Sequence, residues 1–347
     1  MIRGQARVYA DSVIPSARRQ GGMLLFAFAL TMCLSARAQA GPMQLPAVAA
    51  PVVYVRLLQG NVIVRTWNRQ VVQVEGDPSV EARSLPPRVV ANRLPKQMML
   101  WSQTLVTKDG ARLTLPAEPF PFPNLDQTPH DGVVIHGKGN ATITIPANTA
   151  LLVTVVRKGS IAIDGFRNGT FAALMGGGKI TLDRVSGTGA VQLNYGPFIA
   201  RDSTFDRIRV RTGRGNMFFE RCTSAQIQAT SLLGTIVYDD GSFTPGLAHF
   251  ESQRGNIALG VNGDALVNAH SDAGRIFTSG DVPIARGAND AQATYARGGP
   301  VVTATSARGS VIFYRGSLRM HPQLQQRFNL RRPPARPRPS RRPPRLP

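Results

Sequence analysis

The chain of 347 residues contains 41 Lys and Arg against 20 Asp and Glu, together with 34 Gly and 26 Pro. Because 42% of its residues are hydrophobic, it can bury a core, which excludes a wholly disordered chain. No apolar run approaches the roughly 20 residues of a membrane-spanning helix, and the composition also excludes collagen-like and coiled-coil chains. The profile is typical of an all-β protein punctuated by glycine and proline.

The net charge of +21 is concentrated at the two ends of the chain. Residues 1–40 carry five Arg and one Asp, and residues 319–347 carry nine Arg and no acidic residue, which leaves +8 for residues 41–318. The global charge therefore overstates how cationic the folded part is.

The first 40 residues are typical of a secretory signal peptide. An Arg pair precedes an apolar run over residues 23–34, and Ala-Gln-Ala at 38–40 supplies an A-x-A cleavage site. The mature chain is expected to begin near Gly41, in the periplasm or at the cell surface. Cys222 would be its one cysteine, so no intramolecular disulfide is possible, and burial of this thiol is expected.

Residues 41–150 alternate apolar and polar side chains irregularly, and we expect a β cap that merges into the first repeats and covers their open end. A cluster of Pro, Asp and Asn over residues 118–126 predicts a loop. The expected strands span residues 52–55, 62–64, 71–74, 98–106, 112–115, 133–136 and 141–145.

Residues 151–318 contain a repeated unit of about 19 residues, Gly-x-apolar-x-apolar. Its glycines stand at positions 159, 178, 196, 215, 234, 255, 274 and 309. The last step, of 35 residues, leaves room for a degenerate unit at 290–297. A second short alternating segment follows most units, so each repeat is expected to form two short strands and two turns.

This near-constant spacing predicts a single-stranded β-solenoid, because each repeat can bury its inward side chains only against the repeats before and after it. Glycine at each corner supplies the backbone freedom that a tight bend requires. With repeats about 4.8 Å apart, the inward positions should stack in one apolar column. Those positions are Ile161, Ile180, Phe198, Met217, Ile236, Ile257, Ile276 and Val311.

Residues 319–347 have almost no apolar side chain to bury, and Arg and Pro dominate the last part of this segment. The composition predicts a disordered, extended tail that either attaches to anionic surfaces or acts as a solvated spacer. Its candidate contact residues are Arg331, Arg332, Arg336, Arg338, Arg341, Arg342 and Arg345.

Two segments carry a resemblance to a known family. The first is a strand–Trp–strand opening over residues 60–74, and the second is an Ile-Pro step at 145–146 that leads into the Gly159 unit. Over residues 52–313 the chain resembles secreted bacterial β-strand-repeat proteins known as putative adhesins, which are related to adhesin head domains. The resemblance implies an exported single-chain β-solenoid with an adhesive role and no catalytic residue. The Arg/Pro tail, the Pro-rich loop and the irregular late repeats depart from the family pattern.

A search for catalytic and cofactor motifs is nearly empty, since the chain lacks G-x-S-x-G, H-E-x-x-H, C-x-x-C and P-loop sequences. No cofactor and no metal site is expected. The alternative is a polysaccharide lyase or hydrolase that uses Asp239 and Asp240, with acidic residues of neighbouring repeats in the same register. Interspersed Arg184, Arg201 and Arg221 make a salt-bridge ladder between repeats an equal explanation.

Basic residues flank the corner glycines and would form a basic edge if the repeats stack in register. They are Lys158, Lys179, Arg214, Arg254, Arg275 and Arg308. Charges spaced about 5 Å apart match a linear polyanion, so anionic polysaccharide or lipopolysaccharide is an expected partner. Charged turns that keep a repeat protein soluble are the alternative, and a cytosolic nucleic acid is disfavoured by the signal peptide.

The strand position between each inward pair is mostly apolar, which is unusual for a side chain that faces solvent. Its larger members, the apolar strip, are Ile199, Phe218, Val237, Phe277 and Ile312. Cover by the N-terminal segment, by a second copy or a partner protein, or by a ligand would each explain it.

These features predict an exported, non-enzymatic envelope protein that acts as an adhesin or binding scaffold for anionic glycans or a protein partner. Its mature chain is expected to have no transmembrane span. A self-assembling solenoid joined end to end and a polysaccharide-active enzyme are the alternatives.

Overall fold

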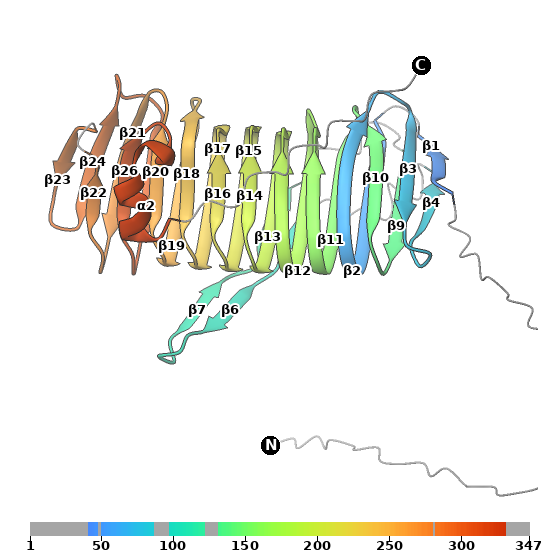
Figure 1. The fold of residues 1–347 in the computed structure, drawn as a ribbon, viewed down its shortest axis with the longest axis horizontal. Helices are drawn as coiled ribbons and strands as arrows, with labels where there is room; N and C mark the ends of the chain where they lie inside the picture. The colour runs from blue at the N-terminus through green and yellow to red at the C-terminus, as the bar shows by residue number, and fades with distance from the viewer. Residues whose placement is uncertain (1–40, 48–49, 87–96, 122–130, 280–281, 331–347) are drawn as a thin grey trace, which may run out of the picture. The chain divides into compact units, whose positions relative to one another are not determined.

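The computed structural model describes residues 41–47, 50–86, 97–121, 131–279 and 282–330. In this part of the chain the fold is all-β, as predicted, apart from a 3-10 turn, η2 (Leu318–Met320), and one α-helix, α2 (Pro322–Phe328), near its end (Figure 1). The predicted signal peptide and the seven candidate arginines of the tail lie outside the described residues.

The centre of the fold is a stack of parallel strands in which each repeat pairs with the next. Ile161 pairs with Ile180, and Met217 pairs with Ile236, both 19 residues further along the chain. The strands of this central stack are β11 (Leu151–Asp164), β12 (Gly169–Asp183), β13 (Ser186–Tyr195), β14 (Phe198–Arg201), β15 (Thr204–Arg214), β16 (Met217–Glu220), β17 (Thr223–Leu233), β18 (Ile236–Phe243), β19 (Ala248–Arg254) and β20 (Ile257–Val261). The register of the glycine repeat is therefore the register of the strand pairing.

Alternation along each strand separates an inner from an outer set of apolar side chains. Inward residues such as Ile180 and Leu182 belong to one continuous buried core, whereas Ile199 and Phe218 belong to a separate cluster on the outer face. Phe219 lies between Phe198 and Tyr238 in the core, with ring centroids 5.3 and 5.9 Å away. In-register parallel pairing places like residues above one another, which produces this aromatic column.

The corner glycines are required because backbones of neighbouring repeats approach closely there. A Cβ on Gly178 would lie 1.7 Å from the carbonyl oxygen of Gly159, and Gly178 also has a φ of +137°. The second corner is formed by Gly165 in the β11 repeat, at a φ of +77°, but in the next four repeats by residues in the left-handed region that are not glycine. They are Arg184, Asp202, Arg221 and Asp240.

The order of repeats at both ends of the stack differs from the order in the sequence. At the N-terminal end, β9 (Gly132–Gly137) and β10 (Ala141–Pro146) pair with β2 (Val52–Trp67), whose other edge pairs with β11. Residues 132–146 therefore lie outside residues 52–67, although they follow them in the chain.

At the C-terminal end, β25 (Val301–Ser306) and β26 (Val311–Arg315) are inserted between two earlier repeats. They pair with β19 and β20 on one side, and with β21 (Ala265–Ser271) and β22 (Ile276–Thr278) on the other. The predicted column is correct in its members but wrong in its order, because Val311 lies between Ile257 and Ile276.

Antiparallel strands pair with the outermost parallel repeats at both ends (Figure 1). At the N-terminal end these are β3 (Val71–Gly76) and β4 (Glu81–Leu85), and β1 (Met43–Pro46) pairs in turn with β3. At the C-terminal end it is β24 (Asp290–Tyr295), and β23 (Ile284–Arg286) pairs in turn with β24. The segment 290–297, which we predicted to be a degenerate repeat, is therefore built around an antiparallel strand. An open repeat exposes unpaired N–H and C=O groups, and these strands satisfy part of that edge.

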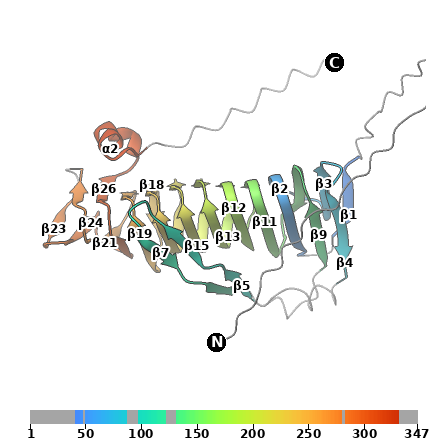
Figure 2. The same cartoon turned by 90° about the horizontal axis from the view of Figure 1, so that it is seen from below.

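Residues 97–121 form a hairpin arm that lies along another outer face of the stack, not the one that carries Ile199 and Phe218 (Figure 2). It consists of β5 (Gln97–Leu100), β6 (Gln103–Val106), β7 (Arg112–Leu115) and β8 (Glu118–Pro121). The buried Gln192 side chain accepts a hydrogen bond from the Trp101 N–H at 2.7 Å and donates one to the Trp101 carbonyl at 2.9 Å. The start of the loop predicted at 118–126 is thus a strand, and residues 122–130 lie outside the described ranges.

Candidate binding site

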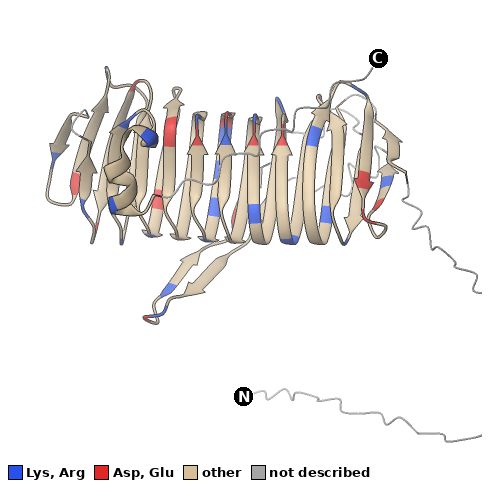
Figure 3. Ribbon diagram, in the orientation of Figure 1, with Lys and Arg blue, Asp and Glu red and all other residues tan. Residues whose placement is uncertain are grey.

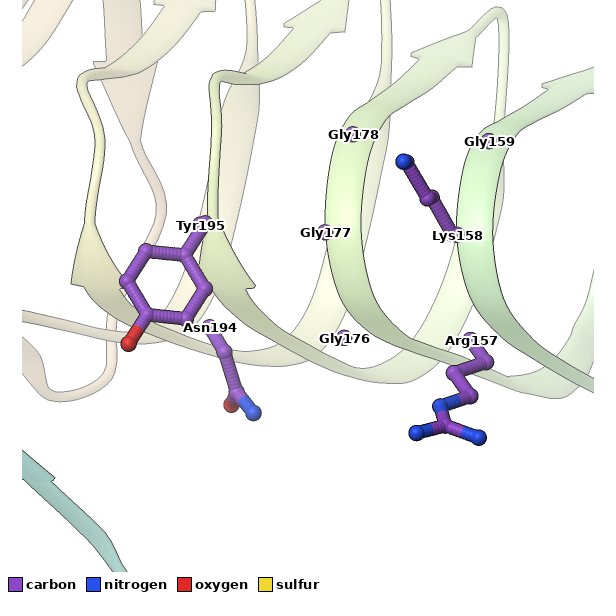
Figure 4. Close-up of a pocket in the computed structure, with 8 residues that line it drawn as sticks. All are labelled: Arg157, Lys158, Gly159, Gly176, Gly177, Gly178, Asn194 and Tyr195. Atoms are coloured by element: carbon purple, nitrogen blue, oxygen red, sulfur yellow. The ribbon is translucent and has the colours of Figure 1, made fainter. Parts of the chain in front are cut away.

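An open depression of about 680 Å³ lies at the glycine corner of three successive repeats (Figure 4). We call it the basic groove. Its lining residues are Arg157, Lys158, Gly159, Gly176, Gly177, Gly178, Asn194 and Tyr195. Strand pairing sets the order across it, since Gly177 pairs with Lys158 on one side and Tyr195 on the other, and Tyr195 pairs with Arg214.

Four exposed cations lie in or beside the basic groove. Arg157 and Lys158 project from β11, Lys179 follows the glycines of β12, and Arg214 ends β15. Across the described parts of the chain, none of the four has an ion-pair partner within 4.0 Å. Within those parts, no acidic side chain neutralises their charges.

Tyr195 and Asn194 supply the uncharged part of the groove. The Tyr195 side chain is 52% exposed, and Figure 4 shows it projecting from the ribbon beside Asn194. Asn194 Oδ1 accepts a hydrogen bond of 2.7 Å from Gln103 Nε2 of the hairpin arm. The arm thus fixes the orientation of one residue of the groove from about 90 positions earlier in the chain.

The predicted basic edge is divided by the structure into two columns. Lys158 and Arg214 share a register position with Arg254, immediately before a corner glycine, whereas Lys179 and Arg275 stand immediately after one. Gly177, Tyr195 and Leu233 interrupt the first column. Of the six predicted residues, Lys158 lines the groove, while Lys179 and Arg214 adjoin it, Lys179 directly after Gly178 and Arg214 paired with Tyr195.

Two other members of the predicted edge are engaged by the hairpin arm. Asp109 at the tip of the arm binds Arg254 at 2.8 Å and Arg308 at 3.3 Å. The side-chain hydrogen bond from Arg254, with a second from Thr107, holds the pKa of Asp109 well below its usual range. Both arginines hold the tip of the arm through Asp109, so their charges are partly neutralised, although the Arg308 side chain is still 60% exposed.

The apolar strip is covered by the C-terminal segment, residues 318–330. Phe277 packs against Phe328 of α2 with ring centroids 4.8 Å apart, and the Arg327 guanidinium lies 4.4 Å from the centre of the Phe277 ring. Ile199, Phe218, Val237 and Ile312 share one buried cluster with Leu318 and Leu330. The expectation of disorder from residue 319 is thus wrong up to residue 330, and the cover is not the N-terminal segment.

Asp239 and Asp240, the residues of the enzymatic alternative, have structural partners. Asp239 is buried, and its Oδ1 accepts hydrogen bonds from the Leu318 N–H at 2.6 Å and the Tyr314 hydroxyl at 3.2 Å. Asp240 Oδ1 accepts from Asn262 Nδ2 at 3.3 Å. Asp239 thereby holds the start of the C-terminal segment.

The remaining charges of this register form a ladder of ion pairs between repeats. Arg184 binds Asp164 at 2.6 Å, Arg201 binds Glu220 at 3.2 Å, and Arg221 binds Asp202 at 2.6 Å. Figure 3 shows acidic residues near the arrowheads of the central strands, with basic residues beside them. Salt bridges between repeats therefore explain why charged residues recur at this register position. A catalytic cluster of carboxylates was the other explanation.

Sequence reasoning missed Arg157, Asn194 and Tyr195. The repeat could have indicated Tyr195, because it stands directly before the corner glycine Gly196, just as Lys158 and Arg214 stand directly before theirs. Within the described ranges, no group of three or more His, Cys, Asp and Glu residues could hold a metal ion. No helix among the described residues is long and apolar enough to cross a membrane.

No family model and no curated protein matches the chain. Among solved structures, the chain is similar to a putative cell adhesion protein from Clostridium sporogenes, at 10% sequence identity and with a TM-score of 0.25. That match covers 79% of this chain and 99% of the other. A likeness at this level carries no further conclusion about the site, so function is inferred from the basic groove itself.

Proposed function

We propose that the protein is an exported, non-enzymatic β-solenoid of the cell envelope that acts as an adhesive scaffold and binds an anionic ligand in the basic groove. The observation that carries this proposal is the set of four exposed cations, Arg157, Lys158, Lys179 and Arg214, around one depression without ion-pair partners among the described residues. The sequence resemblance to secreted repeat proteins supports the exported, adhesive role.

The stack presents these charges at fixed spacing. Lys158, Gly177, Tyr195 and Arg214 occupy four consecutive repeats, so their Cα atoms span roughly 15 Å at about 4.8 Å per repeat. A linear polyanion meets charges at this spacing without rearrangement of the backbone. Such pairing is electrostatic, and its affinity must therefore fall with salt.

The structure also bears on the alternatives. Antiparallel strands pair with the outermost parallel repeats at both ends, which disfavours assembly by end-to-end stacking of repeats. The Asp239 carboxylate is buried and accepts two hydrogen bonds, which supports a structural role over acid–base catalysis.

The test compares binding of the mature chain, residues 41–347, to dextran sulfate and to uncharged dextran at low and physiological salt. We expect dextran sulfate alone to bind, with an affinity that falls as salt rises. Combined replacement of Lys158, Lys179 and Arg214 by Ala should weaken binding at least about tenfold, because three of the four cations around the groove are removed.

Arg275→Ala is the matched control, since Arg275 belongs to the predicted basic edge but lies outside the groove. It should bind like the unmodified chain. Equal losses in both variants, or no binding of dextran sulfate at all, would contradict the proposal.

A further inference from the structure

We infer that the ligand of the basic groove is an acidic oligosaccharide whose sugar ring stacks on Tyr195 between the cations. This inference rests on the proposed function and adds the chemical class of the ligand. A bare polyanion needs only positive charge, whereas the groove also presents an aromatic face, an oriented amide and an unfilled floor.

The unfilled floor is shown by Gly177. Its neighbours are glycine for structural reasons, because a Cβ on Gly176 would lie 2.5 Å from the Arg157 carbonyl oxygen and one on Gly178 would lie 1.7 Å from the Gly159 carbonyl oxygen. A Cβ on Gly177 would meet nothing closer than Tyr195 at 4.0 Å, and its φ is not positive. The backbone therefore allows a side chain at residue 177. Because the residue is glycine, the space beside Tyr195 stays open.

The aromatic face lies within the row of cations. Tyr195 stands in register between Gly177 and Arg214, and Lys158 follows on the far side of Gly177. Aromatic side chains pair an apolar ring with a polar edge, as a pyranose ring pairs a C–H face with hydroxyl groups. A ring placed over Gly177 would thus contact Tyr195 while its carboxylate reaches Lys158, Arg157 or Lys179.

The amide donor is oriented by the hairpin arm. Because Asn194 Oδ1 already accepts from Gln103 Nε2, the Nδ2 group is the part of this amide left to bind a ligand. In the described structure Nδ2 has no hydrogen-bond partner, and Figure 4 shows the amide projecting away from the ribbon. A fixed N–H donor beside an aromatic ring suits a sugar hydroxyl.

The test uses isothermal titration of the mature chain with hexagalacturonate, with linear polyphosphate of matched charge and with oligothymidylate. The variants are Tyr195→Ala, Tyr195→Phe and Gly177→Gln. We expect Tyr195→Ala to weaken hexagalacturonate binding about tenfold, the scale of one aromatic contact, and to leave polyphosphate binding unchanged. Tyr195→Phe keeps the ring and should retain most of the affinity.

Gly177→Gln should abolish hexagalacturonate binding by filling the floor, while its unfolding midpoint stays at or above that of the unmodified chain. The saccharide assignment would be overturned if Tyr195→Ala weakened the binding of hexagalacturonate and polyphosphate equally, or weakened neither. Polyphosphate binding by the unmodified chain would in that case leave the anion-binding function intact. Tyr195-dependent binding stronger for oligothymidylate than for hexagalacturonate would also overturn it. Absence of binding by every anion would instead refute the proposed function.

Discussion

At the scale of single residues, burial and backbone approach decide what each side chain can do. Cys222 is buried, as expected, and desolvation raises the pKa of its thiol to about 12. The thiolate is therefore essentially absent at neutral pH, which protects Cys222 from intermolecular disulfide formation. The sequence indicated this outcome because the residue lies in a strand-rich apolar repeat.

The adjacent residues Gly177 and Gly178 should respond differently to substitution by alanine. Gly178→Ala should lower the free energy of unfolding by at least about 1–3 kcal/mol, because its positive φ is strained for alanine and its Cβ would clash with the Gly159 carbonyl. Gly177→Ala should be neutral or stabilising by roughly 0.4–1 kcal/mol, because it only restricts the unfolded chain. Denaturant unfolding of both variants measures the difference, and equal effects would show that the corner does not demand glycine.

At the scale of elements, the hairpin arm connects parts of the chain that are far apart in sequence. Asp109 at its tip binds Arg254 and Arg308, and Leu105 and Leu115 pack with Leu232. The arm also orients Asn194 in the basic groove. The hairpin itself has a local strand–turn–strand pattern, but nothing local indicates which repeats it contacts.

We expect the tip of the arm to loosen in acid. The Asp109 pKa is depressed by its hydrogen bond from Arg254, so its contribution is fully present above the ordinary carboxyl pKa of 3.8 and is lost as the pH falls below that value. Amide hydrogen exchange of β6 and β7, corrected for intrinsic rates, should therefore increase from pH 5 to pH 2. Asp109→Asn should show fast exchange already at pH 5 and no further pH effect, whereas unchanged protection in this variant would exclude the ion pairs as the cause.

At the scale of the whole molecule, the C-terminal segment covers the outer face of the repeats that carries the apolar strip. Leu318, Leu330 and the partly buried Phe328 pack with the apolar strip, and Asp239 holds the first turn through the Leu318 N–H. The segment thus belongs to the folded domain as far as residue 330.

Truncation separates this cover from the Arg/Pro tail. A chain ending at Leu318 should expose the apolar strip, bind a hydrophobic dye and aggregate, because Phe218, Val237 and Ile312 lose their cover. A chain ending at Leu330 should do neither. Identical dye binding by the two truncations would show that residues 319–330 do not cover the strip.

Local sequence determined the all-β class, the 19-residue register, the glycine corner and the alternation of inner and outer side chains. Each of these depends on the period of the chain and on the space available to one residue, which the sequence itself carries. The tertiary structure decided the order of repeats at both ends, the antiparallel strands there and the cover of the apolar strip. It also decided which cations remain available, because Asp109 meets Arg254 and Arg308 from 145 and 199 residues away. Ion pairs and covers of this kind arise between distant segments whose approach no local pattern specifies, and so only the folded chain distinguishes the basic groove from the rest of the basic edge.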